Sequence, residues 1–137
     1  MQKASFVLGL VLLIIPLSDQ AKGICVSVPI TVSEIKGRVQ TQRDEAIPQT
    51  TVELWKRKGG EERGTLVRNI IVDKNGAFEI LDVEKGRYLL IFKNKYFSDW
   101  WQPVRLKSTS KNKGKRLVVF LAPDFADPCS EGGAVLR

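Results

Sequence analysis

Short apolar stretches separated by turn-forming residues run from Glu34 to Ala122, and this pattern limits what the chain can fold into. The stretches recur about every ten residues, as in an all-β sandwich or barrel. No window after Gly23 has the 3.6-residue apolar period of an amphipathic helix, so we expect little helix. The pattern predicts seven strands, at residues 34–41, 50–57, 64–72, 76–83, 87–95, 101–108 and 115–122.

The alternation of side chains within these segments indicates which residues face the core. Trp55 shares a strand face with Glu53 and Arg57, so we expect its ring to lie outside the main core. Residues 88–92 are apolar on both faces. A strand of that kind is expected at the centre of a sheet, where both of its faces are covered.

The sequence Asp73-Lys74-Asn75-Gly76 lies between two apolar stretches and predicts a tight β-hairpin. Asn75 and Gly76 both tolerate the positive φ angle that such a turn requires. A calcium loop is the alternative interpretation. It would need oxygen ligands at alternate positions and a bidentate Glu further on, whereas Ala77 follows here, so a turn is favoured.

The first 23 residues have the features of an export signal. An uncharged run at residues 6–17 is too short to span a membrane, which takes roughly 20 apolar residues. Ala21 and Gly23 offer two cleavage positions for a signal peptidase. A lipoprotein anchor needs a small residue before the cysteine, but Ile24 precedes Cys25. We therefore expect a secreted or periplasmic protein without a permanent membrane anchor.

The two cysteines, Cys25 and Cys129, allow a single pairing, and export favours a structural disulfide. Closing a loop of about a hundred residues is worth on the order of 4–5 kcal/mol in the loop-entropy model. A reactive thiol pair would need close spacing and a basic neighbour. Residues 24–123 then form the sandwich domain, and residues 124–137 form a tail tied back by the disulfide. The pair Gly132-Gly133 predicts that the tail is flexible beyond Cys129.

The composition argues against catalysis and against metal binding. The chain has no histidine, the commonest general base and the commonest metal ligand. Ser130 lies near Asp127 and Glu131, but no base is available to activate its hydroxyl. We expect no catalytic residue, no metal and no cofactor. Export argues against nucleic acid as a partner, despite the net charge of +7.

Three tryptophans are the candidate contact residues: Trp55, Trp100 and Trp101. Exposed aromatic rings stack on sugars, peptides or partner surfaces. Neighbouring residues of a strand point to opposite faces, so one ring of the Trp100–Trp101 pair should face outward. Asn94, Asp99 and Gln102 are near enough in sequence to meet sugar hydroxyls. The alternative is that the rings pack beneath a loop as part of the core.

A basic stretch at residues 107–116 could form an electrostatic rim through four side chains: Lys111, Lys113, Lys115 and Arg116. Positive charge without a neighbouring acid attracts anionic polymers and membrane surfaces. The alternative is a solvated loop whose lysines prevent pairing at a sheet edge.

Four segments in order carry a family resemblance: Lys36-Gly37-Arg38-Val39, Ile47-Pro48 before Thr51-Val52-Glu53-Leu54, residues 72–78 and residues 83–90. With these segments the chain resembles a carboxypeptidase regulatory-like domain, of the transthyretin-like (prealbumin-like) or carbohydrate-binding-like type. The resemblance implies a seven-stranded Greek-key β-sandwich. It is a better guide to fold than to activity.

The resemblance carries over no catalytic group. The zinc domain that accompanies such modules in carboxypeptidases has no counterpart here. Transthyretin-related hydrolases end in Tyr-Arg-Gly-Ser, whereas this chain ends in Gly133-Ala134-Val135-Leu136-Arg137. We expect an exported, non-catalytic module with a binding or structural role, and a glycan or an envelope protein as its partner. The alternatives are a small transthyretin-like hydrolase and a protein-interaction or spacer module; the oligomeric state is left open.

Overall fold

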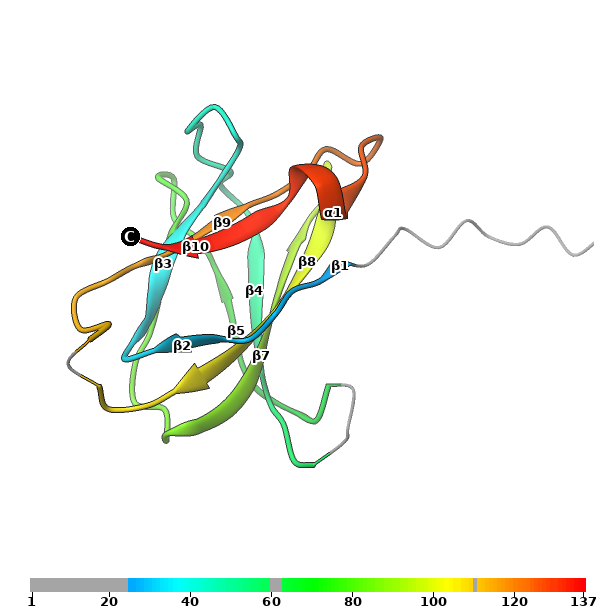
Figure 1. Cartoon of the computed structure of the whole chain (residues 1–137). Coiled ribbons are helices and arrows are strands. Elements are labelled where there is room, and N and C mark those ends of the chain that lie inside the picture. Colours follow the sequence, from blue (N-terminus) through cyan, green and yellow to red (C-terminus); the bar gives the residue numbers. More distant parts are fainter. Residues whose placement is uncertain (1–24, 60–62, 110) are drawn as a thin grey trace, which may run out of the picture.

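The computed structural model describes residues 25–59, 63–109 and 111–137, and the expected export signal lies outside these ranges (Figure 1). The described residues form ten strands and one short helix. Their bounds are β1 Cys25–Val26, β2 Ile30–Val32, β3 Ile35–Gln40, β4 Thr51–Lys56, β5 Thr65–Ile71, β6 Ala77–Ile80, β7 Gly86–Asn94, β8 Phe97–Leu106, β9 Leu117–Phe120, α1 Pro128–Glu131 and β10 Gly133–Leu136. The predicted all-β class and low helix content are confirmed. All seven predicted segments contain strands, and β1, β2 and β10 are additional.

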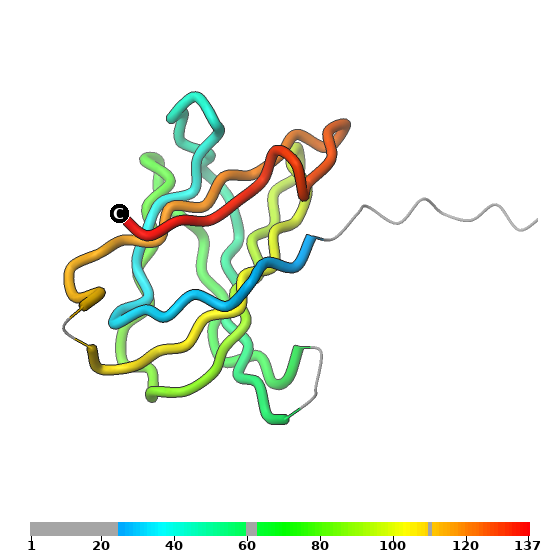
Figure 2. Tube along the Cα trace, in the orientation of Figure 1, coloured from blue at the N-terminus to red at the C-terminus, as the bar shows by residue number. Residues whose placement is uncertain are grey.

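The strands form two mixed sheets that face each other as a sandwich (Figures 1 and 2). The six-stranded sheet has the order β1-β8-β7-β4-β5, and β2 also pairs with β8. The four-stranded sheet has the order β10-β9-β3-β6. Most neighbours are antiparallel, but β1 and β2 run parallel to β8, and β3 runs parallel to β9.

The main core fills the space between the inner faces of the two sheets. Every residue from Tyr88 to Phe92 is buried, so β7 is the central strand that the sequence predicts. On the inner face, Phe92 meets Phe78 of the other sheet edge to face, with ring centroids 5.5 Å apart. Gly37 lies in the middle of β3, where a Cβ atom would collide with the carbonyl oxygen of Leu117. The parallel pairing of β3 with β9 therefore requires glycine at this position.

The turn at Asp73–Gly76 is confirmed, but it does not join a pair of hydrogen-bonded strands. The Asp73 carboxylate accepts hydrogen bonds from the backbone N–H groups of Asn75, at 2.8 Å, and Ala77, at 3.0 Å. Gly76 has the expected positive φ, at 72°. However, β5 pairs with β4 and β6 pairs with β3, in different sheets. The hairpin prediction is therefore wrong in its pairing, and the turn is a crossover between sheets.

The Cys25–Cys129 disulfide is present, with 5.2 Å between the Cα atoms, and it links β1 of the six-stranded sheet to α1. The predicted flexible tail is corrected, because β10 pairs with β9 along its whole length. Gly132 makes this return possible, since a Cβ atom there would press against the Trp100 ring at 2.9 Å. Within the described ranges, no helix has the length and apolar character to cross a membrane.

Candidate functional site

The outer face of the six-stranded sheet carries three arginines side by side, which we call the arginine row: Arg57, Arg87 and Arg105. Arg87 and Arg105 are direct partners in the β7–β8 register. The backbone N–H of Arg57 donates to the carbonyl of Arg87 at 3.1 Å, which continues the row from the end of β4. Like charges placed directly opposite each other across strands destabilise a sheet. The register therefore places the like charges of Arg87 and Arg105 side by side on this face.

The arginine row lines a shallow pocket of about 190 Å³. Pro29, Gly59, Tyr88 and Pro103 complete its lining, and no carboxylate lines it in the described part of the chain. The guanidinium group of Arg87 donates to the Gly59 carbonyl at 3.4 Å. The Tyr88 hydroxyl is already used, since it donates to the backbone carbonyl of Glu84 at 2.6 Å. Burial raises the pKa of this hydroxyl, so it remains a neutral donor.

Apolar rows adjoin the arginine row on the same face. The strand registers align Trp55 with Leu89, and Leu89 with Pro103. The next row brings Ile91 beside Trp101. Leu89, Ile91 and Trp101 form a small second cluster, separate from the main core, and Trp55 packs against it. The outer face thus carries a row of positive charge beside a buried apolar cluster, of which Trp55 is the partly exposed member.

Polar contacts hold the two outer tryptophans in place. The Arg63 guanidinium lies 4.9 Å from the ring centroid of Trp101 and 5.7 Å from that of Trp55. The Trp55 indole N–H donates to the Glu53 carboxylate at 3.2 Å, and this carboxylate pairs with Lys93, also at 3.2 Å. The buried indole N–H of Trp101 has no hydrogen-bond partner in the structure. Trp101 therefore contributes packing to this face rather than a fixed polar contact.

The expected exposure of the tryptophan pair is corrected. Trp100 faces inward and is 5% exposed in the main core, where its N–H donates to Gln102 at 3.3 Å. Trp101 does point outward, as the alternation predicts, but it is only 3% exposed because Trp55 and Arg63 cover it. Trp55 lies outside the main core as predicted, and its ring is half-buried. Of the three candidates, only Trp55 offers a surface to a ligand.

The amides suggested for sugar contacts serve the fold instead. Gln102 is fully buried and donates to the carbonyls of Val28 and Pro103, both at 2.9 Å. The Asn94 amide donates to the Thr50 hydroxyl at 3.1 Å. Asn94 also borders a hollow of about 440 Å³ at the opposite end of β7 from the arginine row. Its amide is committed to holding the strand ends, so this hollow is the weaker candidate.

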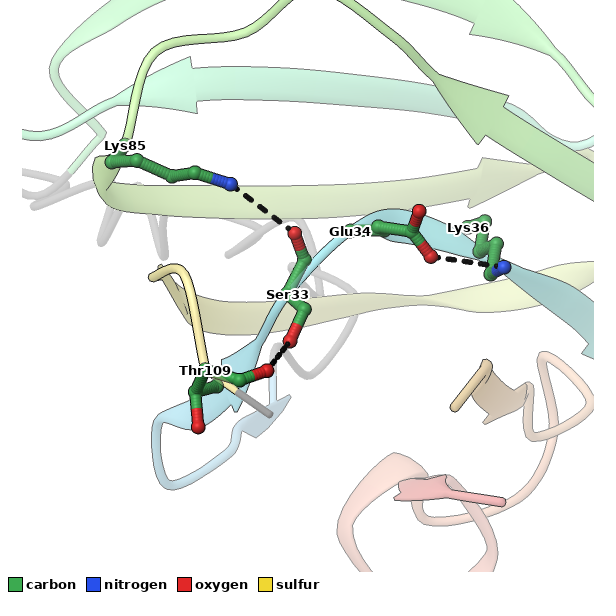
Figure 3. A network of polar contacts seen from close by, with 5 residues as sticks. All are labelled: Ser33, Glu34, Lys36, Lys85 and Thr109. Carbon is green, nitrogen blue, oxygen red and sulfur yellow. Dashed lines mark hydrogen bonds and ion pairs between the residues drawn. The ribbon is translucent and has the colours of Figure 1, made fainter. Parts of the chain in front are cut away.

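The four basic residues of the 107–116 stretch, Lys111, Lys113, Lys115 and Arg116, are exposed, and we call them the lysine loop. The stretch is held to the sheet by polar contacts at its base (Figure 3). There the Ser33 hydroxyl donates to the Thr109 carbonyl at 2.8 Å, and the Lys85 ammonium donates to the Ser33 carbonyl. The neighbouring Glu34 carboxylate pairs with Lys36 at 2.9 Å.

Acidic groups accompany the lysine loop, in contrast to the arginine row. The hydrogen bond from Lys36 lowers the pKa of Glu34, and the positive field of Lys113 adds to this effect. Arg116 lines a separate hollow together with Asp73 and Glu79. The charge of the lysine loop is therefore partly neutralised on the protein itself.

The polar residues Asp127 and Ser130 near the carboxyl end form the N-terminal cap of α1. The Asp127 carboxylate accepts from the Cys129 backbone N–H at 3.0 Å and from the Ser130 hydroxyl at 2.9 Å. These hydrogen bonds, that of Cys129 above all, lower the pKa of Asp127. Ser130 therefore donates its proton to the cap, as an N-terminal capping arrangement requires.

The arginine row is the feature that sequence reasoning missed. Arg87 and Arg105 belong to β7 and β8, and Arg57 directly follows β4; neither their spacing along the chain nor local charge density connects them. The alternation pattern places each arginine on an outer face, but only the strand order and the register bring them together. Comparison with protein-family models, with curated proteins and with solved structures finds no match for this chain.

Proposed function

We propose that the protein is an exported, non-catalytic binding module that acts in the cell envelope or outside the cell, with a glycan as its ligand. The single observation that carries this proposal is the outer face of the six-stranded sheet. There the half-buried Trp55 ring adjoins the arginine row. An aromatic platform beside guanidinium donors suits a sugar ring and its oxygen atoms.

The fold and the covalent structure support this proposal. A disulfide is compatible with a secreted or periplasmic location. The strands β3 and β6 pair in one sheet, while the two strands between them, β4 and β5, pair in the other. This connection supports the Greek-key, prealbumin-like arrangement that the family resemblance implies. The lysine loop remains a proposed electrostatic rim.

The chemistry of the pocket favours binding over hydrolysis. A hydrolase would need a general acid or base in the pocket, whose charge can change near neutral pH. Guanidinium groups are not deprotonated in proteins, and they are the charged groups that line the pocket in the described residues. These observations support a role in recognition.

The test replaces the ring that the ligand would contact. We expect Trp55→Ala to lose retention on a glycan array and on a cell-wall preparation. The matched control is Tyr96→Ala, because Tyr96 is an aromatic residue that is 68% exposed, at the other end of the β7–β8 pair. Equal retention of the two variants and the wild type would reject Trp55 as a contact residue. Retention lost in both would indicate non-specific adhesion.

A further inference from the structure

The arginine row has a structural cost that a ligand would offset. Arg87 and Arg105 are direct partners across β7 and β8, and Arg57, directly after the end of β4, extends the row. Paired positive charges of this kind repel each other, and no carboxylate lines their pocket in the described ranges. An anion bound among the guanidinium groups would convert the repulsion into attraction.

The backbone holds the arginine row rigidly. Adjacent strands lie about 4.8 Å apart, so three neighbouring arginines span on the order of 10 Å. The buried side chains Leu89 and Pro103 adjoin them in the next row and fix the strands. On the other side of β8, Thr31 of β2 pairs with Arg105, so β8 is paired on both sides at this position. The sheet therefore fixes the backbone positions from which these side chains extend.

The geometry selects the kind of anion. Guanidinium groups bind carboxylate, phosphate and sulfate through pairs of parallel N–H···O bonds. A carboxylate has two oxygens, whereas a sulfate or phosphate ester has three free oxygens and can meet three arginines at once. The pocket has a volume of about 190 Å³, and Trp55 lies on the same sheet face, two residues before Arg57. One charged group would occupy the pocket while an adjoining sugar ring would contact the exposed part of Trp55.

We propose that the arginine row binds a sulfate or phosphate ester of an acidic glycan, whose sugar ring rests on the partly exposed Trp55 ring. This proposal rests on the proposed function, because it takes the ligand to be a glycan. It adds the anionic group that the glycan must carry and the three residues that recognise it.

The experiment measures the affinity of the disulfide-bonded protein for dextran sulfate and for uncharged dextran of the same length at constant salt. Two variants each remove two positive charges, Arg87→Gln with Arg105→Gln in the arginine row and Lys111→Gln with Lys113→Gln in the lysine loop. We expect dextran sulfate to bind at least tenfold more weakly to the row variant and less than threefold more weakly to the loop variant. Inorganic sulfate and phosphate are then compared as competitors, to identify the preferred group.

Each outcome decides a separate claim. Equal losses in the two variants would overturn the site and show attraction by net charge alone. An unaffected row variant together with lost glycan retention in Trp55→Ala would overturn the anion site but keep the proposed function. Row-dependent binding of inorganic sulfate without retention of any glycan would keep the anion site but reject the glycan. Thermal unfolding of the row variant, expected at or above the wild-type temperature, confirms that it is folded.

Discussion

The two basic regions of the molecule, the arginine row and the lysine loop, concentrate positive charge in opposite ways. The lysine loop gathers its four charges within residues 111–116, on an exposed segment whose Lys113 acts on Glu34. The arginine row gathers its charges from β7, from β8 and from the residue that follows β4, and no carboxylate is among the described residues that line its pocket. Charge density along a sequence therefore does not identify the better site. The strand register, which places Arg87 directly opposite Arg105, is visible only in the folded sheet.

The largest change in stability should come from removing the Cys25–Cys129 disulfide, which connects the sheet of the arginine row to the segment that leads into the other sheet. Cys25 belongs to the sheet of the arginine row, and Cys129 leads into β10, whose partner strand β9 follows the lysine loop. Replacing both cysteines by serine should lower the free energy of unfolding by about 4–5 kcal/mol, because 104 residues separate them. Urea unfolding measures this loss. A loss near zero would show that the core alone holds the two regions together.

The next largest change in stability should distinguish the packed sheet face around Trp101 from the exposed lysine loop. Trp101→Ala should lower the free energy of unfolding by about 3–5 kcal/mol, because it opens a cavity in the buried apolar cluster. Trp101→Phe should cost less than Trp101→Ala, because phenylalanine keeps part of the ring volume and the lost indole N–H has no partner. Lys113→Ala in the lysine loop should change stability by no more than about 0.5 kcal/mol. If Trp101→Ala and Lys113→Ala lower the free energy of unfolding by similar amounts, the two regions do not differ in how firmly they are packed.

A smaller effect, with the opposite sign, tests the repulsion within the arginine row. Arg105→Gln should raise the free energy of unfolding by about 0.2–1 kcal/mol, because it relieves the like-charge pair with Arg87. The gain should shrink as salt screens the charges. Denaturant titrations at low and high salt measure both quantities. If Arg105→Gln destabilises the protein at low salt, the arginine row is not under electrostatic strain.

The smallest effect concerns the acid beside the lysine loop. Contact with Lys36 lowers the pKa of Glu34 in the folded protein, so its contribution to stability is present above the usual pKa of 4.5 and is lost as the pH falls through the lower, folded value. Glu34→Gln should therefore reduce the drop in thermal stability on acidification below pH 4.5. Thermal scans from pH 7 to pH 3 provide the measurement. Superimposable pH profiles would show that the loop has no effective counter-charge.

The sequence predicts the fold class because period-two alternation leaves little choice. The predictions from sequence that were wrong concern single elements, and each has a physical cause. The strands β1 and β2 have only 2 and 3 residues, too few to show alternation. The strand β10 follows a pair of glycines that resembles a flexible linker, although Gly132 is there because the Trp100 ring leaves no room for a side chain. The Asp73–Gly76 turn has hairpin chemistry, but a turn sequence alone does not specify which strands pair.

The site was less predictable than the fold. Alternation correctly predicts that Trp55 lies outside the main core and that Trp101 points outward. It cannot predict that Arg63, from a distant loop, covers the Trp101 ring. The register that places Arg87 opposite Arg105 depends on the pairing of whole strands. Residues that act together across a sheet therefore became visible only once the strand order was known.

The most direct test of the central claim follows the arginine Nε–H signals by NMR during titration with dextran sulfate. The account predicts that the largest shifts belong to Arg57, Arg87 and Arg105, with the Trp55 indole N–H following at the same midpoint. Backbone amides of the lysine loop should shift weakly and in proportion to ionic strength. The account is contradicted if the loop amides shift most and the signals of the arginine row stay in place.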